Sequence, residues 1–101
     1  MKFGLDDKTL EQIRAVFVKF PEIKKVVLYG SRAKGNYKPG SDIDPTIKNS
    51  TLGLTKLNAV RSALDDLSTP YTFDLSTYEQ ITSAELIEHI DRVGVVFYED
   101  N

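Results

Sequence analysis

Residues 26–47 decide the fold, and they read Val-Val-Leu-Tyr-Gly-Ser-Arg-Ala-Lys-Gly-Asn-Tyr-Lys-Pro-Gly-Ser-Asp-Ile-Asp-Pro-Thr-Ile. The stretch opens with four apolar residues, 26–29, which predict a short buried strand. Because they are apolar without alternation, this strand is expected in the middle of a sheet. Gly30 and Ser31 then predict a turn that leads into one helical turn over 31–35.

Two carboxylates follow on a second predicted strand, 42–47. Side chains alternate along a strand, so Asp42 and Asp44 point to one face while Ile43 points into the core. Adjacent carboxylates repel each other unless a cation lies between them. Carboxylate oxygens are typical ligands of Mg²⁺, which proteins often hold together with substrate phosphates.

The residues before this pair form a candidate phosphate site. Gly30 lets the backbone approach a ligand closely, and Ser31 offers a hydroxyl and an amide. Arg32 and Lys34 add positive charge, and the arginine has a fork suited to phosphate oxygens. The order of strand, Gly-Ser turn and two-carboxylate strand therefore predicts a site for a metal-bound triphosphate.

The sequence does not match two other motifs that bind phosphate or metal. A Walker loop fits the spacing of Gly30 and Gly35, but Asn36 and Tyr37 stand where Lys and Ser or Thr are needed. A calcium-binding loop that starts at Asp42 needs Gly at its sixth position and Glu at its twelfth. Those places are occupied by other residues, Ile47 and Gly53.

The pattern of Gly30-Ser31, ten residues, and Asp42-Ile43-Asp44 resembles the signature of the polymerase-beta-like nucleotidyltransferase superfamily. The longer strings Gly-Ser-Arg-Ala-Lys-Gly and Gly-Ser-Asp-Ile-Asp resemble its smallest branch, the minimal nucleotidyltransferases (MNT proteins) encoded beside HEPN-domain partners. The resemblance implies an α/β (α+β) fold, a mixed sheet of about four strands flanked by helices. Residues 1–101 are expected to form a single nucleotidyltransferase domain.

Pro45 departs from the related families, which usually carry a larger aliphatic residue there. Proline cannot donate to a ladder, so this strand is expected to lie at an edge, to bulge, or to be short beyond Asp44. The carboxylates would then be held less rigidly.

Hydrophobic spacing and turn chemistry predict the other elements. They are a helix from Asp6 or Asp7 to about Lys19, loops over 36–41 and 49–53, a helix over 54–67, a strand over 71–76, a helix from a capping box at Thr82 to Arg92, and a strand over 95–98. Asp74 is the only carboxylate of its strand and lies on its polar face, as the third acid of the superfamily pattern does. His89 has no partner at metal-ligand spacing and is interpreted as a surface or packing residue.

Composition limits the possible functions. The net charge of −2 argues against direct nucleic-acid binding, the absence of cysteine fits the cytoplasm, and the sequence has no membrane-spanning run or signal peptide. Charge is uneven: residues 24–48 hold six basic and two acidic side chains, and residues 49–101 hold three and nine. The basic excess coincides with the predicted phosphate loop, as an anionic substrate would require.

If the three acids converge, Asp42 and Asp44 bind two Mg²⁺ ions, and Asp74 helps to hold the second ion and accepts or orients the proton of an attacking hydroxyl. Gly30 and Ser31 would hold the β- and γ-phosphates of ATP, with Arg32 nearby. The chain ends after this core, so a separate protein is expected to supply the acceptor. The resemblance implies that this partner is a HEPN toxin, that AMP is transferred from ATP to one of its tyrosines, and that the chain is the antitoxin of a HEPN/MNT toxin–antitoxin module.

Two alternatives stay open. The chain could neutralise its partner by contact alone, as a non-catalytic module with the same fold, and Pro45 is the main support for this reading. It could instead be a stand-alone transferase for a small-molecule or RNA acceptor, although no acceptor-binding domain is evident.

Overall fold

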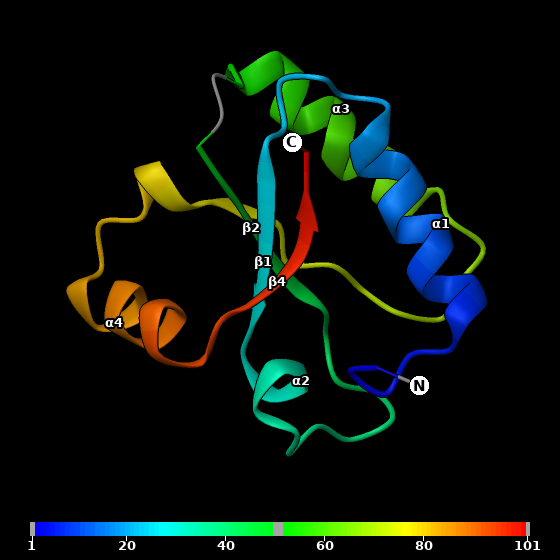
Figure 1. Ribbon diagram of the computed structural model, residues 1–101. Helices are drawn as coiled ribbons and strands as arrows, with labels where there is room; N and C mark the ends of the chain where they lie inside the picture. The colour runs from blue at the N-terminus through cyan, green and yellow to red at the C-terminus, as the bar shows by residue number, and fades with distance from the viewer. Residues whose placement is uncertain (1, 50–51, 101) are drawn as a thin grey trace.

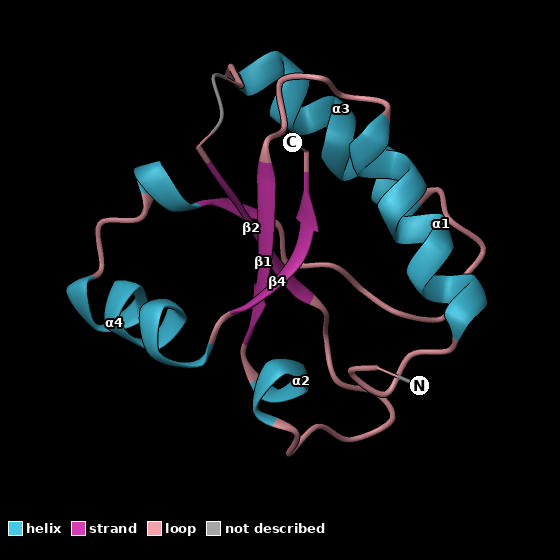
Figure 2. Cartoon of the chain, in the orientation of Figure 1, coloured by secondary structure: helices cyan, strands magenta, loops and turns pink. Residues whose placement is uncertain are grey.

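The computed structural model describes residues 2–49 and 52–100 and is built on a mixed four-stranded sheet in the order β3-β2-β1-β4 (Figure 2). The elements in chain order are α1 (Asp7–Val18), β1 (Lys25–Tyr29), α2 (Ser31–Lys34), β2 (Asp44–Lys48), α3 (Leu54–Asp65), β3 (Ser76–Thr77), the 3₁₀ turn η1 (Tyr78–Gln80), α4 (Ala84–Val93) and β4 (Val95–Glu99). The predicted fold class is confirmed by this mixed sheet with flanking helices.

The central strand is β1, as its apolar sequence predicts. It pairs antiparallel with β2 on one side and with β4 on the other, while β2 pairs parallel with β3. Its last four residues are buried, because helices cover both faces of the sheet at this point.

The two faces of the sheet differ in what covers them. In Figure 1, α1 and α3 lie on one side of the strands and α4 lies on the other. Val26 and Leu28 join the larger core beneath α1 and α3, whereas Val27 and Tyr29 pack with Ile90 of α4 in a smaller cluster. The alternation of β1 side chains thus supplies both cores.

The helices begin and end close to the predicted residues. The Asp6 carboxylate caps α1 by accepting a 2.8 Å hydrogen bond from the Thr9 amide. The cap of α4 is Ser83, one residue after the predicted Thr82, and its hydroxyl accepts a 3.2 Å bond from the Leu86 amide. Gly94 ends α4 as expected.

β2 is not at an edge, continues to Lys48 and pairs with β1 without a bulge, so the three alternatives expected from Pro45 are corrected. The strand lies inside the sheet, where Pro45 is buried and opposes Leu28 of β1. The backbone amide of Ile43 donates to the Thr72 carbonyl at 2.9 Å. Backbone amides two residues apart on a strand point the same way, so the nitrogen of residue 45 also faces this segment and not β1. The missing N–H therefore removes a bond to the segment that leads into β3 and leaves the β1–β2 ladder complete.

The segment over 71–76 is less regular than predicted. It makes an isolated parallel bridge from Phe73 to Ile43, and regular pairing resumes only at Ser76–Thr77 of β3. The interruption lies opposite Pro45, which has no amide to donate. The alternation itself is confirmed, because Phe73 and Leu75 face the larger core while Asp74 is exposed.

Two further findings complete the description. Part of the predicted loop over 49–53, residues 50–51, lies outside the described residues. Among the helices that the structure describes, none combines the length and the apolar character needed to cross a membrane.

Candidate active site

The turn between β1 and α2 requires glycine at position 30. Gly30 has φ +76° and ψ −157°, a backbone region that is essentially restricted to glycine. A Cβ atom there would lie 2.4 Å from Oδ2 of Asp44. The carboxylate of Asp44 therefore packs directly against the backbone of the Gly-Ser turn. Ser31 follows as the first residue of α2 and is partly exposed.

Asp44 begins β2 and stands opposite Tyr29 in the ladder, on the face of the sheet that α4 covers. The pKa of its carboxyl group is raised from 3.8 to about 6, first by burial and then by the negative charges of Asp74 and Asp42, in that order. Negative charge is thus crowded at this end of the strands.

A short parallel register brings the other two acids beside Asp44. Ile43 pairs with Phe73, and the amide of Asp74 donates to the Ile43 carbonyl at 2.9 Å. This register sets position 74 beside position 44 and position 72 beside position 42. In agreement with it, the hydroxyl of Thr72 donates a hydrogen bond to Oδ1 of Asp42.

The acids are adjacent but are not arranged as a ready metal cage. Within 2–49 and 52–100, no group of three or more His, Cys, Asp or Glu side chains is placed closely enough to hold a metal ion. The donor set nevertheless fits Mg²⁺, because it consists of carboxylate oxygens and because the negative charges of Asp74 and Asp42 lie close enough to raise the pKa of Asp44. A cation between these groups would relieve the repulsion. Asp42, Asp44 and Asp74 are the residues that could hold one.

Arg32 is bound by protein groups in this structure, and its contact with a phosphate stays a prediction. Its side chain is only 3% exposed, and its guanidinium donates to the carbonyl oxygens of Phe3, Pro39 and Ser41. A guanidinium that is bound in this way has few N–H donors left for a phosphate. Of the predicted nucleotide-binding residues, the structure leaves Gly30 and Ser31 at the turn and places Arg32 beneath it as a structural contact.

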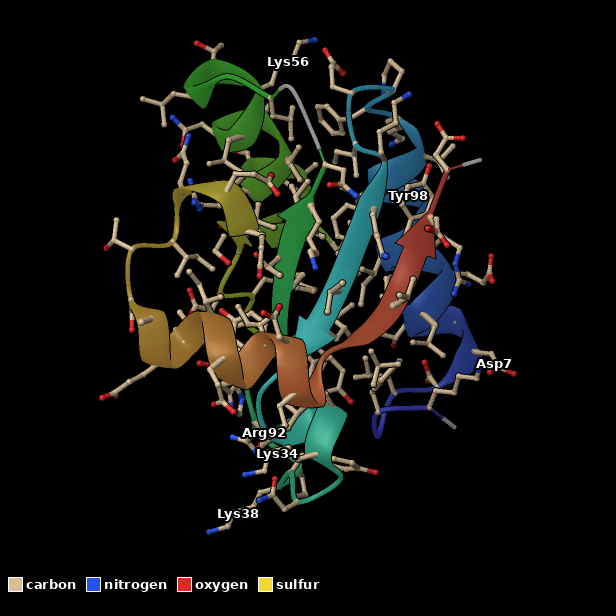
Figure 3. All side chains as sticks on the ribbon, turned by 60° about the vertical axis from the view of Figure 1, so that its left-hand side comes forward. Asp7, Lys34, Lys38, Lys56, Arg92 and Tyr98 are labelled. Carbon is tan, nitrogen blue, oxygen red and sulfur yellow. The ribbon has the colours of Figure 1, made fainter. Side chains whose placement is uncertain are left out.

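Basic side chains still gather at this end of the sheet. Lys34 of α2, Lys38 of the following loop and Arg92 near the end of α4 all lie at the lower end of the molecule in Figure 3. Asp7 lies apart from them, on the α1 side. The charge distribution predicted from the sequence therefore has a counterpart in space, since the Gly-Ser turn directly precedes α2.

Two polar residues that the sequence did not single out line the acids. Thr72 bonds to Asp42, and Ser76 of β3 donates to Thr46 of β2 at 3.0 Å. The signal was available, because alternation places Thr72 and Ser76 on the same polar face as Asp74.

Tyr29 also lies close to the acids, on the covered side of the site. Burial raises the pKa of its hydroxyl, a hydrogen bond with Ser76 opposes the rise, and the Asp44 and Asp74 carboxylates add to it. His89 stacks edge-on against the Tyr29 ring, with centroids 6.1 Å apart, and so serves as a packing residue.

A cleft of about 470 Å³ lies elsewhere, between the N-terminal segment, α1, α2 and β4. None of the three acids lines it. The acids instead lie at the ends of β2 and of the segment before β3.

Comparisons with known proteins identify the family and the fold. Residues 11–101 match the polymerase beta nucleotidyltransferase family, and no curated protein sequence gives a match. A chain from the crystal structure of a toxin–antitoxin with AMP-PNP shares 20% identity, with a TM-score of 0.64, over 96% of this chain and 76% of that one. A chain of the toxin–antitoxin MntA–HepT shares 16% identity, with a TM-score of 0.67, over 94% and 74%.

A third structure is a tri-AMPylated Shewanella oneidensis HEPN toxin in complex with MNT antitoxin. The match has 16% identity and a TM-score of 0.69, and it covers 95% of this chain and 74% of that one. At such identities the likeness shows a shared fold, and this is the fold predicted from the sequence. The family match covers all four strands and the three acids. The chain therefore belongs to the polymerase beta nucleotidyltransferase family.

Proposed function

We propose that this protein is a magnesium-dependent nucleotidyltransferase that transfers AMP from ATP to a hydroxyl group of a partner protein. The single observation that carries the proposal is the seating of the Asp44 carboxylate against Gly30, with Asp74 and Asp42 beside it. This places crowded negative charge directly next to a turn whose backbone can approach a triphosphate closely. Such a site suits a cation and a nucleotide together.

Each residue has a distinct role in the proposed reaction. Asp42 and Asp44 would hold two magnesium ions, with Asp74 contributing to the second, and Gly30 and Ser31 would contact the β- and γ-phosphates. Magnesium, when bound, would neutralise the triphosphate and stabilise the attacking and leaving oxygens. The acceptor oxygen forms a bond to the α-phosphorus, the bond to the bridging oxygen breaks, and pyrophosphate leaves with the bonding electrons. Asp74 would accept the proton of the acceptor hydroxyl, because it is exposed and lies on a different segment from Asp42 and Asp44.

The proposed partner is a HEPN toxin, and the proposed acceptor is one of its tyrosines. Support comes from the shared fold with the complexes described above, one of which contains an AMPylated HEPN toxin. The proposed module works in the cytoplasm, which the absence of cysteine fits. Neutralisation by contact alone has lost its main support, because Pro45 leaves the β1–β2 ladder complete and Asp44 in place.

The direct test is transfer to the product of a neighbouring HEPN gene. The purified pair is incubated with ATP and MgCl₂, and the intact mass of the partner is measured. We expect the partner to gain the mass of one or more AMP groups, and Asp42→Asn and Asp44→Asn to reduce the rate by about 100-fold or more, since each removes a charged group that acts on the transition state. Asp65→Asn, on the exposed end of α3, is the matched control and should transfer normally.

Two outcomes would contradict the proposal. A stable complex without an adduct would show neutralisation by contact. An adduct on a small molecule or RNA in the absence of a partner would show a stand-alone transferase.

A further inference from the structure

We infer that Arg32 is a positioning residue that fixes the loop carrying Asp42 against the segment carrying Asp74. The inference rests on the proposed function, because it assigns Arg32 a task in assembling the same site. It differs from a phosphate contact, since Arg32 acts here entirely through protein groups.

The first part of the argument is the binding of Arg32 to the loop before Asp42. Its Nε and Nη2 atoms donate to the Ser41 carbonyl at 3.2 and 3.0 Å, and Nη2 also donates to the Pro39 carbonyl at 3.4 Å. Ser41 directly precedes Asp42. The fork therefore holds the peptide group that leads into the first acid.

The second part is the contact with the opposite segment. The guanidinium carbon of Arg32 lies 4.9 Å from the ring centroid of Tyr71. Tyr71 directly precedes Thr72, which bonds to Asp42. Asp74 lies two residues after Thr72 on the same segment. One side chain thus touches both segments that deliver acids to the site.

The third part is the cover over the guanidinium. The ring of Tyr37 lies over the guanidinium, with its centroid 5.2 Å from the guanidinium carbon. On the same group, Nη1 donates to the Phe3 carbonyl at 2.7 Å. Gly4 allows this approach: its φ is +73°, and a Cβ there would lie 2.3 Å from the Tyr37 ring and 2.9 Å from Nη1 of Arg32. The N-terminal segment is thereby shaped to fit over the arginine.

The charge of Arg32 is buried without an acidic partner among the described residues. The ion pairs found within 2–49 and 52–100 all involve other cations. Carbonyl oxygens and aromatic faces on three separate segments satisfy it instead. Lysine could not reproduce this, because it is a point charge without a planar fork.

The test compares Arg32→Lys with Arg14→Lys. Arg14 is a matched control, because its guanidinium also lies on an aromatic ring, that of Phe97 at 5.2 Å, and it also donates to a backbone carbonyl, yet it is on α1. Two quantities are measured on the protein alone: amide hydrogen exchange and the affinity for Mg-ATP by calorimetry. Neither requires a partner or a transfer reaction.

We expect Arg32→Lys to speed exchange in residues 36–43 by about tenfold or more, because bonds from a charged donor to buried carbonyls are lost. We expect Mg-ATP binding to weaken in parallel, while Arg14→Lys leaves both quantities near their native values. Tyr71→Leu keeps the carbonyl bonds and removes the ring contact, and it should give a smaller change of both quantities.

Three results would overturn the inference. Weaker Mg-ATP binding with native exchange over 36–43 would show that Arg32 grips phosphate directly. Faster exchange spread evenly over the whole chain would show a general contribution to stability. If Arg32→Lys does not fold, native values for Tyr71→Leu overturn it. If the native protein fails to bind Mg-ATP, the proposed function fails while the exchange data still decide whether Arg32 holds the loop.

Discussion

Asp44 combines three features that rarely occur together in one carboxylate. It is half-buried, it packs on a glycine backbone, and it has two other carboxylates as neighbours. Its burial and the two neighbouring carboxylates disfavour its charged form in the absence of a cation. Its ionisation should therefore be visible in the stability of the whole chain.

The stability of the metal-free protein should depend on pH through Asp44. Because its pKa is about 6 in the folded state and 3.8 ordinarily, the folded state binds the proton more tightly than the unfolded state. The free energy of unfolding should then fall as pH rises from 3.8 to about 6. Thermal unfolding in EDTA, measured across this range, checks the slope.

The control is Asp44→Asn, whose free energy of unfolding should no longer fall with pH through this group. Above about pH 6, the variant should be more stable than the native protein. Adding MgCl₂ at neutral pH should raise the unfolding temperature of the native protein and have less effect on the variant. Equal slopes for the two proteins would mean that Asp44 titrates normally.

Gly30→Ala should damage the site and the fold together. The new methyl group would be forced into a strained backbone region and onto Oδ2 of Asp44, so we expect a loss of about 1–3 kcal/mol in the free energy of unfolding. Urea denaturation measures this change. Gly40→Ala is the matched control, since a Cβ at that position meets nothing within 4 Å. Similar losses in both variants would contradict the close approach at position 30.

Among the elements, α4 offers the sharpest comparison between sequence pattern and structure. The pattern favours Thr82 as the cap, whereas the structure places the cap at Ser83. Ser83→Ala should therefore lower the free energy of unfolding by about 1 kcal/mol, because the Leu86 amide loses its acceptor. Thr82→Ala should change it by a few tenths at most, by the same measurement. The reverse ranking would restore the cap predicted from the sequence.

The elements most accurately predicted are those set by local pattern. The helical spacing of Leu10, Ile13 and Phe17 locates α1, and the apolar run of β1 correctly indicates a central strand. The strand over 71–76 was predicted from alternation alone, which reports the faces of a segment but not its hydrogen bonds. Its break depends on Pro45, a residue on another strand, and pairing of this kind is not visible in a local window.

At the scale of the whole molecule, the sequence predicts which acids make up the candidate site. It does not predict the contacts of Arg32 with the segments that carry them. Spacing and alternation select Asp42 and Asp44, and the resemblance to the superfamily pattern adds Asp74. Arg32 was assigned to phosphate because a guanidinium fork suits phosphate and carbonyl oxygens alike. Its actual partners, at Phe3, Ser41 and Tyr71, are brought together only by the folded chain.

The pairing of β1 with β4 has a consequence for synthesis of the protein. The central strand and the Gly-Ser turn emerge early from the ribosome, but one edge of β1 stays open until residues 95–99 arrive. Contacts so distant along the chain form late. A nascent chain therefore carries its acids before it has the completed sheet to hold them.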